Sequence, residues 1–255
     1  MKRRALVLIL LGLLAYLGFL IATFPAGWAY ALAKPRLQPL GIKLYAVEGT
    51  LWDGHVAAME IQGRRLPELQ WQLRPTALLL GRLHTHLDVG GGRLQGEVEL
   101  SLDGRLRLAP VTLHWPLPDL LQRLQLAALP LEGVIQGQMH RLEVVEGLPR
   151  VADGTLTWRG AASGPPMAAK LGDLQLVLET RDDGIHGRFR DGGGPLGLGG
   201  SLRLSPDGAW RLELHLTPRE GRQSPVGRLL AFLGRPDPQG KITLRRSGRL
   251  QATGP

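Results

Sequence analysis

One stretch, RLQGEVELSLDGRLRL at residues 93–108, predicts the fold of most of this chain. On both sides of Asp103-Gly104, leucine or valine alternates with a polar or charged residue. Successive side chains of a strand point to opposite faces, so this pattern gives each strand one apolar and one polar face. Asp-Gly favours the tight turn between two antiparallel strands. The stretch therefore predicts a hairpin with a single buried face.

The same arrangement recurs along residues 41–255. Residues 201–216 repeat it around Ser205-Pro206-Asp207-Gly208, and the chain carries 35 glycines and 19 prolines, which suits a turn-rich fold. Further Asp-Gly pairs predict turns at 53–54, 153–154, 183–184 and 191–192. Short helices are expected at 76–80, 118–129 and 224–233, the last with Ser224 as N-cap. The predicted fold class is mainly β: a twisted antiparallel sheet with a few short helices.

A weak similarity links the two halves of this region. The segment 48–54 (EGTLWDG) is similar to 132–137 (EGVIQG), and the hairpin at 94–108 corresponds to 202–216. In each half one tryptophan, Trp71 or Trp158, lies between the short motif and the hairpin. We interpret this as two β-rich repeats, at 41–117 and 130–255, with chance similarity in a Gly- and Leu-rich chain as the alternative.

The first 40 residues have a different composition. Lys2, Arg3 and Arg4 precede an uncharged apolar run at 5–24, whose 20 residues would span roughly 30 Å as a helix, the thickness of a bilayer core. The sequence thus predicts a cytoplasmic tip at 1–4, a transmembrane helix at 5–24 and a juxtamembrane linker at 25–40. Trp28 and Tyr30 fall where an interfacial aromatic belt is expected, and the basic tip directs residues 41–255 to the far side. The alternative is a cleaved signal peptide, whose apolar region is usually shorter.

Catalytic signals are poor. The chain has no cysteine, no Gly-x-Ser-x-Gly, no phosphate-binding loop and no His-Glu-x-x-His. His84, His86 and Asp88 would share one strand face and are the best candidates for a metal site, although a solvated polar face explains them more simply. These residues favour a non-enzymatic protein over a metal-dependent enzyme.

The charge is basic but dispersed. The formal net charge is +9, or +6 without the basic tip, and arginines alternate with acidic residues along the strands. Nucleic acid is therefore not an expected partner. The dense late cluster of Arg245, Arg246 and Arg249 could instead attract anionic lipid headgroups.

One set of motifs resembles a known family. VEGTLWDGHV at 47–56, WQLRP at 71–75 and LLLGRL at 78–83 are similar to segments of the type II secretion system protein N family, although Val56 stands where that family usually has a smaller residue. The family motif residues are Gly49, Thr50, Leu51, Trp52, Gly54, Trp71, Pro75 and Gly81. We interpret these residues as structural: Asp53-Gly54 turns the chain and Trp52 fills a core slot. A docking surface is the alternative.

The resemblance implies an accessory component of the inner membrane, with one membrane helix and a periplasmic β-rich domain, that supports export of folded proteins. It implies no enzyme activity and no cofactor. The expected partners are other inner-membrane and periplasmic components of the secretion system, together with membrane lipid. The family is also similar to AsmA-type proteins, so the alternative is a membrane-anchored lipid-handling or envelope-assembly protein with a lipid ligand.

Overall fold

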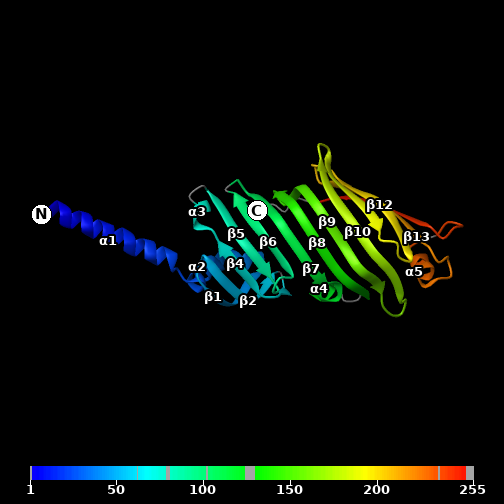
Figure 1. The fold of residues 1–255 in the computed structure, drawn as a ribbon, viewed down its shortest axis with the longest axis horizontal. Helices are drawn as coiled ribbons and strands as arrows, with labels where there is room; N and C mark the ends of the chain where they lie inside the picture. The colour runs from blue at the N-terminus through cyan, green and yellow to red at the C-terminus, as the bar shows by residue number, and fades with distance from the viewer. Residues whose placement is uncertain are drawn as a thin grey trace.

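A single antiparallel sheet dominates the computed structural model, which describes residues 2–61, 63–78, 81–101, 103–123, 130–234 and 236–250 (Figure 1). Within these residues the sheet has fourteen strands. Its strands are β1 (Ile42–Gly49), β2 (Asp53–Ile61), β3 (Arg64–Leu66), β4 (Leu69–Leu73), β5 (Arg82–Val89), β6 (Leu94–Ser101), β7 (Arg105–Pro116), β8 (Leu131–Val145), β9 (Leu148–Ser163), β10 (Ala169–Arg181), β11 (Gly184–Asp191), β12 (Leu196–Leu204), β13 (Ala209–Pro218) and β14 (Ile242–Arg249). The helices are α1 (Lys2–Ala22), α2 (Ala26–Leu37), α3 (Pro75–Leu78), α4 (Leu117–Arg123) and α5 (Pro225–Leu233), with a 3₁₀ turn at Gln38–Leu40.

The order of strands in the sheet follows their order in the chain. Each strand pairs antiparallel with the next, except that β3 pairs only with β2, and β2 then pairs with β4. The predicted hairpins are confirmed: Leu100 pairs with Leu106 across β6 and β7, and Leu204 pairs with Trp210 across β12 and β13. The mainly β, antiparallel fold class is thus correct.

The register gives the sheet two chemically different faces, because directly paired residues share a face. One row joins Leu83, Leu100, Leu106 and Val144 across β5 to β8, and the adjacent row joins His84, Glu99, Arg107 and Glu143. The same division continues to β14. We call the face that contains Leu100 the apolar face and the face that contains Glu99 the polar face.

Helix α5 covers the apolar face at the carboxy-terminal end of the sheet. Ser224 caps this helix by accepting a hydrogen bond from the Gly227 N–H at 3.0 Å, as its sequence predicts. Val226 and Leu230 of α5 are each 2% exposed. They belong to a buried cluster with Ala161, Ala169, Leu171, Leu196, Leu216 and Ile242. A buried hydrophobic cluster therefore lies between α5 and the strands β9–β14.

The other two predicted helices are shorter than expected in the described residues. The segment expected at 118–129 forms α4 (Leu117–Arg123), and residues 124–129 lie outside the described part. The segment expected at 76–80 forms α3 (Pro75–Leu78), with 79 and 80 also outside.

Two Asp-Gly pairs do not form the predicted turns. Asp53-Gly54 begins β2, and Asp153-Gly154 lies inside β9 beside a register shift in β8. At Gly154 an added Cβ would lie 2.7 Å from the Cα of Met139, so the glycine permits close approach of two strands. The same dipeptide thus serves strand packing here and a hairpin turn at Asp103-Gly104.

The structure does not show the two predicted repeats at 41–117 and 130–255 as separate units. Strands β7 and β8 join the two halves in one continuous ladder, which includes Leu113 opposite Gly137. The segments 48–54 and 132–137 also differ in structure, since the first crosses the turn between β1 and β2 and the second lies within β8. One likeness remains: the indole N–H of Trp71 donates to the Leu51 carbonyl, and that of Trp158 to the Glu132 carbonyl.

The amino-terminal helix α1 extends from one end of the sheet (Figure 1). Within the described part of the chain, no helix is sufficiently long and apolar to cross a bilayer, so the predicted membrane span at 5–24 is not supported by this structure. The side chains of residues 2–9, including Lys2, Arg3 and Arg4, lie outside the described ones. Residues 26–37, expected to belong to a linker, instead form α2.

Candidate functional site

The family motif lies at the junction between α1 and the sheet. The indole N–H of Trp52 donates to the carbonyl of Ile21, in the last turn of α1, at 2.7 Å. The Leu51 N–H donates to the Phe24 carbonyl at 2.8 Å. Carbonyls in the last turn of a helix have no partner within the helix. The Ile21 carbonyl also accepts from the Phe24 N–H at 3.3 Å, so Trp52 adds a shorter second hydrogen bond to it. Residues 51 and 52 therefore connect the sheet to the helix end.

Further motif residues shape the turn that presents Trp52. The Thr50 hydroxyl accepts a hydrogen bond from the Asp53 N–H at 3.0 Å, and the Thr50 N–H donates to the Asp53 carbonyl at 2.7 Å. Gly49 has a φ of +84°, which favours glycine, and an added Cβ would lie 2.5 Å from the Asp53 carbonyl oxygen. These contacts explain why small or hydroxylated residues suit this turn.

Trp71 supports the junction from β4. Its indole N–H donates to the Leu51 carbonyl at 3.0 Å, and its ring lies directly against Gly54. An added Cβ at Gly54 would clash with the Trp71 ring and would lie 2.8 Å from the Thr50 carbonyl oxygen. Sequence reasoning expected Trp52 to fill a core slot, but Trp52 is only half-buried and bonds to α1, whereas Trp71 packs against the hairpin.

The remaining predicted motif and anchor residues have separate positions. Pro75 begins α3, and Gly81 precedes β5 with a φ of +68°. In α2, the Tyr30 hydroxyl accepts a hydrogen bond from the Leu44 N–H at 3.1 Å and so attaches α2 to β1. Trp28 is 69% exposed. The contact made by Tyr30 has no signal in the sequence, because it depends on the helix at 26–37.

The candidate metal ligands lie on the polar face of β5, and two of them, His84 and Asp88, have other partners. His86 lies opposite Gln72 of β4 and Glu97 of β6 in the strand register. His84 Nε2 lies 2.5 Å from Glu97 Oε2 on β6. The Asp88 carboxylate accepts hydrogen bonds from the Gly92 N–H at 2.7 Å and from Gln95 Nε2 at 2.6 Å. Among the residues whose placement is described, no group of three or more His, Asp or Glu side chains is arranged to hold a metal ion.

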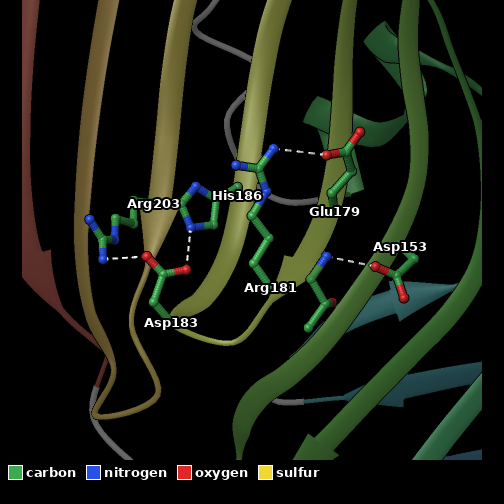
Figure 2. A network of polar contacts seen from close by, with 7 residues as sticks. Asp153, Glu179, Arg181, Asp183, His186 and Arg203 are labelled. Atoms are coloured by element: carbon green, nitrogen blue, oxygen red, sulfur yellow. Dashed lines mark hydrogen bonds and ion pairs between the residues drawn. The ribbon is translucent and has the colours of Figure 1, made fainter.

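A second polar network lies on the polar face near the carboxy-terminal end, where Figure 2 shows it from close by. Asp183, in the turn between β10 and β11, accepts from His186 at 2.7 Å and pairs with Arg203 of β12. The hydrogen bond from His186, with the Arg203 charge, holds the pKa of Asp183 below its ordinary value, although partial burial opposes the shift. Glu179 pairs with Arg181 on β10 at 3.2 Å. Sequence reasoning missed the pair between Asp183 and Arg203 because it depends on the position of β12 beside this turn.

This network borders a hollow of about 410 Å³ on the polar face. The hollow is lined by Val177, Glu179, Arg181, His186, Gly187, Arg188, Arg190, Gly200, Ser201, Leu202 and Arg203. Its lining has several guanidinium groups and one carboxylate but no nucleophile paired with a base. The arrangement therefore suits recognition of a ligand more than bond-making chemistry.

Comparisons with known proteins agree with the motif. The sequence model of "Type II secretion system (T2SS), protein N" matches residues 41–245. A type II secretion system protein N of Aeromonas hydrophila is 32% identical over 256 residues, covering 98% of this chain and 100% of the relative. Those of Vibrio cholerae and Klebsiella pneumoniae are 26% and 28% identical, covering 87% and 91% of this chain and 90% and 94% of the relatives. No solved structure matches the chain. The chain belongs to the type II secretion system protein N family.

Proposed function

We propose that this protein is a non-enzymatic accessory component of the type II secretion system, held in the inner membrane by α1 with its sheet in the periplasm. Family membership, at nearly full length, is the observation that carries the assignment to the secretion system. Other components of that system are accordingly the proposed partners. Their contacts with this chain support export of folded proteins from the periplasm to the exterior.

The composition and exposure of α1 support anchoring. Its described residues from 10 to 22 are exposed and almost wholly apolar, with Leu11 at 64% and Phe19 at 63%. The sequence extends this apolar run back to Ala5 and ends it with Lys2, Arg3 and Arg4. A helix that is apolar on all sides is stable only when lipid or protein surrounds it. The three basic residues favour a cytoplasmic amino terminus.

The junction motif supports a mechanical role. Trp52 bonds to Ile21 in the last turn of α1, and Leu51 bonds to Phe24 just after that helix. The motif would therefore fix the orientation of the sheet relative to α1 and the membrane. We therefore assign Gly49, Thr50, Leu51, Trp52, Gly54 and Trp71 a structural role in this joint. Docking of another protein at these residues is the alternative.

The large exposed area of the sheet supports a scaffold that contacts partners. The accessible surface is 16602 Å², whereas a compact monomer of 27.8 kDa would have about 11,000 Å². The exposed helix α1 accounts for part of the excess. On the sheet, Leu83 and Leu100 of the apolar face remain 37% and 43% exposed. Large exposed apolar surfaces mark sites of interaction.

Deletion of the gene, combined with site-specific crosslinking, tests this function. We expect deletion to reduce release of secreted proteins into the medium. We also expect a photo-reactive residue at Leu100, on the apolar face, to crosslink to another secretion component. The same photo-reactive residue at Gln138, exposed on the polar face of β8, is the control and should not form this crosslink. Unchanged secretion together with no crosslink to any secretion component would contradict the proposal. A crosslink only to phospholipid, identified by mass spectrometry, would favour the lipid-handling alternative.

A further inference from the structure

Three arginines near the carboxy-terminal end of the polar face have no counter-charge among the residues that the structure describes. Arg188 and Arg190 lie on β11 and Arg211 lies on β13, and all three are exposed. None of them has an ion pair with any residue that the structure describes. Their neighbours differ: Arg181, Arg203 and Arg245 pair with Glu179, Asp183 and Glu213. The neighbouring pairs use the local carboxylates, so these three guanidinium groups remain available.

The strand register brings the three arginines to one place. Arg188 pairs with Ser201 and Arg190 with Gly199 across β11 and β12, while Arg203 of β12 pairs with Arg211 of β13. Gly199 and Ser201 are small, so β12 forms a low floor between the longer side chains of β11 and β13. On β13, His215 lies opposite Gly199 and Glu213 lies opposite Ser201, where Arg245 neutralises Glu213. The hollow of about 410 Å³ beside β11 meets a second one of about 380 Å³ at Ser201 and Arg203. We call this floor and its three arginines the arginine trough.

The polar face elsewhere differs from the trough. In the amino-terminal half, Arg82 and Arg107 pair with Glu99, and Arg74 pairs with Glu97. There the cations and carboxylates neutralise one another. Protection of a sheet edge does not explain the trough either, because β11 and β13 are interior strands and β14 forms the edge. The trough therefore gathers three unpaired arginines, whereas Arg159 of β9, also exposed on the polar face, stands apart from them.

The position of the trough favours a protein ligand over a membrane surface. Given that α1 is the anchor, a premise taken from the proposed function, the trough lies at the opposite end of the sheet from the membrane (Figure 1). Eight strand-to-strand steps separate β2 from β11, which is about 40 Å at the usual strand spacing of roughly 4.8 Å. Attraction between charges is screened within about 8 Å at physiological salt. Headgroups of the anchoring membrane would not reach these arginines.

We propose that the arginine trough binds an extended, acidic segment of a partner protein. Arginine binds carboxylates through two parallel hydrogen bonds, and a row of carboxylates along β12 would complement Arg188, Arg190 and Arg211. Bound carboxylates would also contact the Ser201 hydroxyl. The proposal names the kind of partner that the sheet recruits, which family membership leaves open.

Binding of a synthetic acidic peptide to the full chain tests the proposal. The full chain, in nanodiscs of phosphatidylcholine, is titrated into a fluorescein-labelled oligo-glutamate peptide, and binding is followed by fluorescence anisotropy. We expect saturable binding that weakens as salt increases, and no binding of the corresponding oligo-glutamine peptide. The variant Arg188→Gln/Arg190→Gln/Arg211→Gln should weaken binding by about tenfold or more. The matched control, Arg36→Gln/Arg159→Gln/Arg222→Gln, removes the same charge from other exposed positions and should bind like the wild type.

Three outcomes would overturn the proposal. They are an absence of oligo-glutamate binding, equal weakening in both triple variants, and loss of peptide binding when the nanodiscs contain phosphatidylglycerol. The last would mean that anionic headgroups occupy the arginines. Purified protein is sufficient for this assay, so failure here is distinct from a failure of the secretion phenotype. Circular dichroism of both variants verifies that the sheet is intact.

Discussion

Substitution of Gly54 by alanine should disrupt the junction between α1 and the sheet. The added methyl group would clash with the Trp71 ring and approach the Thr50 carbonyl oxygen to 2.8 Å. Overpacking of this kind costs about 1–3 kcal/mol. The sheet pairs each strand only with its neighbours, so we expect the loss of stability to stay near β1, β2 and β4.

Hydrogen exchange measured by mass spectrometry provides the assay. A loss of about 1–3 kcal/mol would accelerate exchange of the affected amides by roughly 5- to 150-fold. The reporters are the Thr50 N–H, which donates to the Asp53 carbonyl, and the Leu73 N–H, which donates to the Trp52 carbonyl at 2.6 Å. Amides of β12 and β13 should exchange as in the wild type.

A second strand glycine serves as the control. At Gly199 in β12, an added Cβ would meet nothing within 4 Å. We expect Gly199→Ala to be neutral or to stabilise by about 0.4–1 kcal/mol, since alanine reduces the freedom of the unfolded chain. Equal exchange rates near the junction in Gly54→Ala and Gly199→Ala would refute the reasoning about the Trp71 contact.

Three further predictions concern the carboxy-terminal end of the sheet. Leu230→Ala removes a side chain that is 2% exposed and should lower the free energy of unfolding by about 2–5 kcal/mol, measured by guanidinium denaturation; a loss below about 1 kcal/mol would contradict the packing of α5. Ser224→Ala removes the α5 cap and should cost about 0.5–2 kcal/mol in the same assay, whereas Ser224→Asp should retain stability. Burial raises the pKa of Asp191, but hydrogen bonds from the Leu198 and Gly193 N–H groups and from Arg219 outweigh this effect and lower the pKa. The contribution of this carboxylate to the stability of the fold is therefore present above the ordinary carboxyl pKa and is lost as pH falls through the lowered pKa. The denaturation midpoints of wild type and Asp191→Asn should therefore differ at pH 7 and converge below about pH 4; a constant difference across this range would contradict the role of that carboxylate.

The two-faced sheet could be predicted from sequence because its cause is local. Alternation along residues 93–108 and 201–216 identifies one apolar and one polar side in each strand without knowledge of pairing. The cap at Ser224 is equally local, since its partner Gly227 is three residues away. Patterns of this kind depend only on backbone geometry.

The parts that sequence reasoning missed depend on contacts between distant residues. Helix α2 lies within the segment 25–40, for which the sequence predicted only a juxtamembrane linker. The role of Trp52 depends on Ile21, 31 residues earlier. At Asp153-Gly154 the glycine accommodates Met139 of the neighbouring strand, a constraint that the dipeptide itself does not reveal.

The arginine trough illustrates the same limit. The spacing of Arg188 and Arg190 indicates a shared face, but only the register through β12 adds Arg211 to them. Two of the acidic residues that neutralise the neighbouring arginines, Asp183 and Glu213, come from a turn or from another strand. Local charge surplus on a sheet therefore requires the pairing of strands as well as their sequences.

Labelling of introduced cysteines tests the anchored topology most directly, because the natural chain has no cysteine. Lys2→Cys and Ser247→Cys, the latter at an exposed position of β14, are treated in intact spheroplasts with a membrane-impermeant maleimide. We predict that Ser247→Cys reacts at once and that Lys2→Cys reacts only after the membrane is permeabilised. Reaction of both residues in intact spheroplasts, or of neither, would contradict a single-pass anchor with a periplasmic sheet.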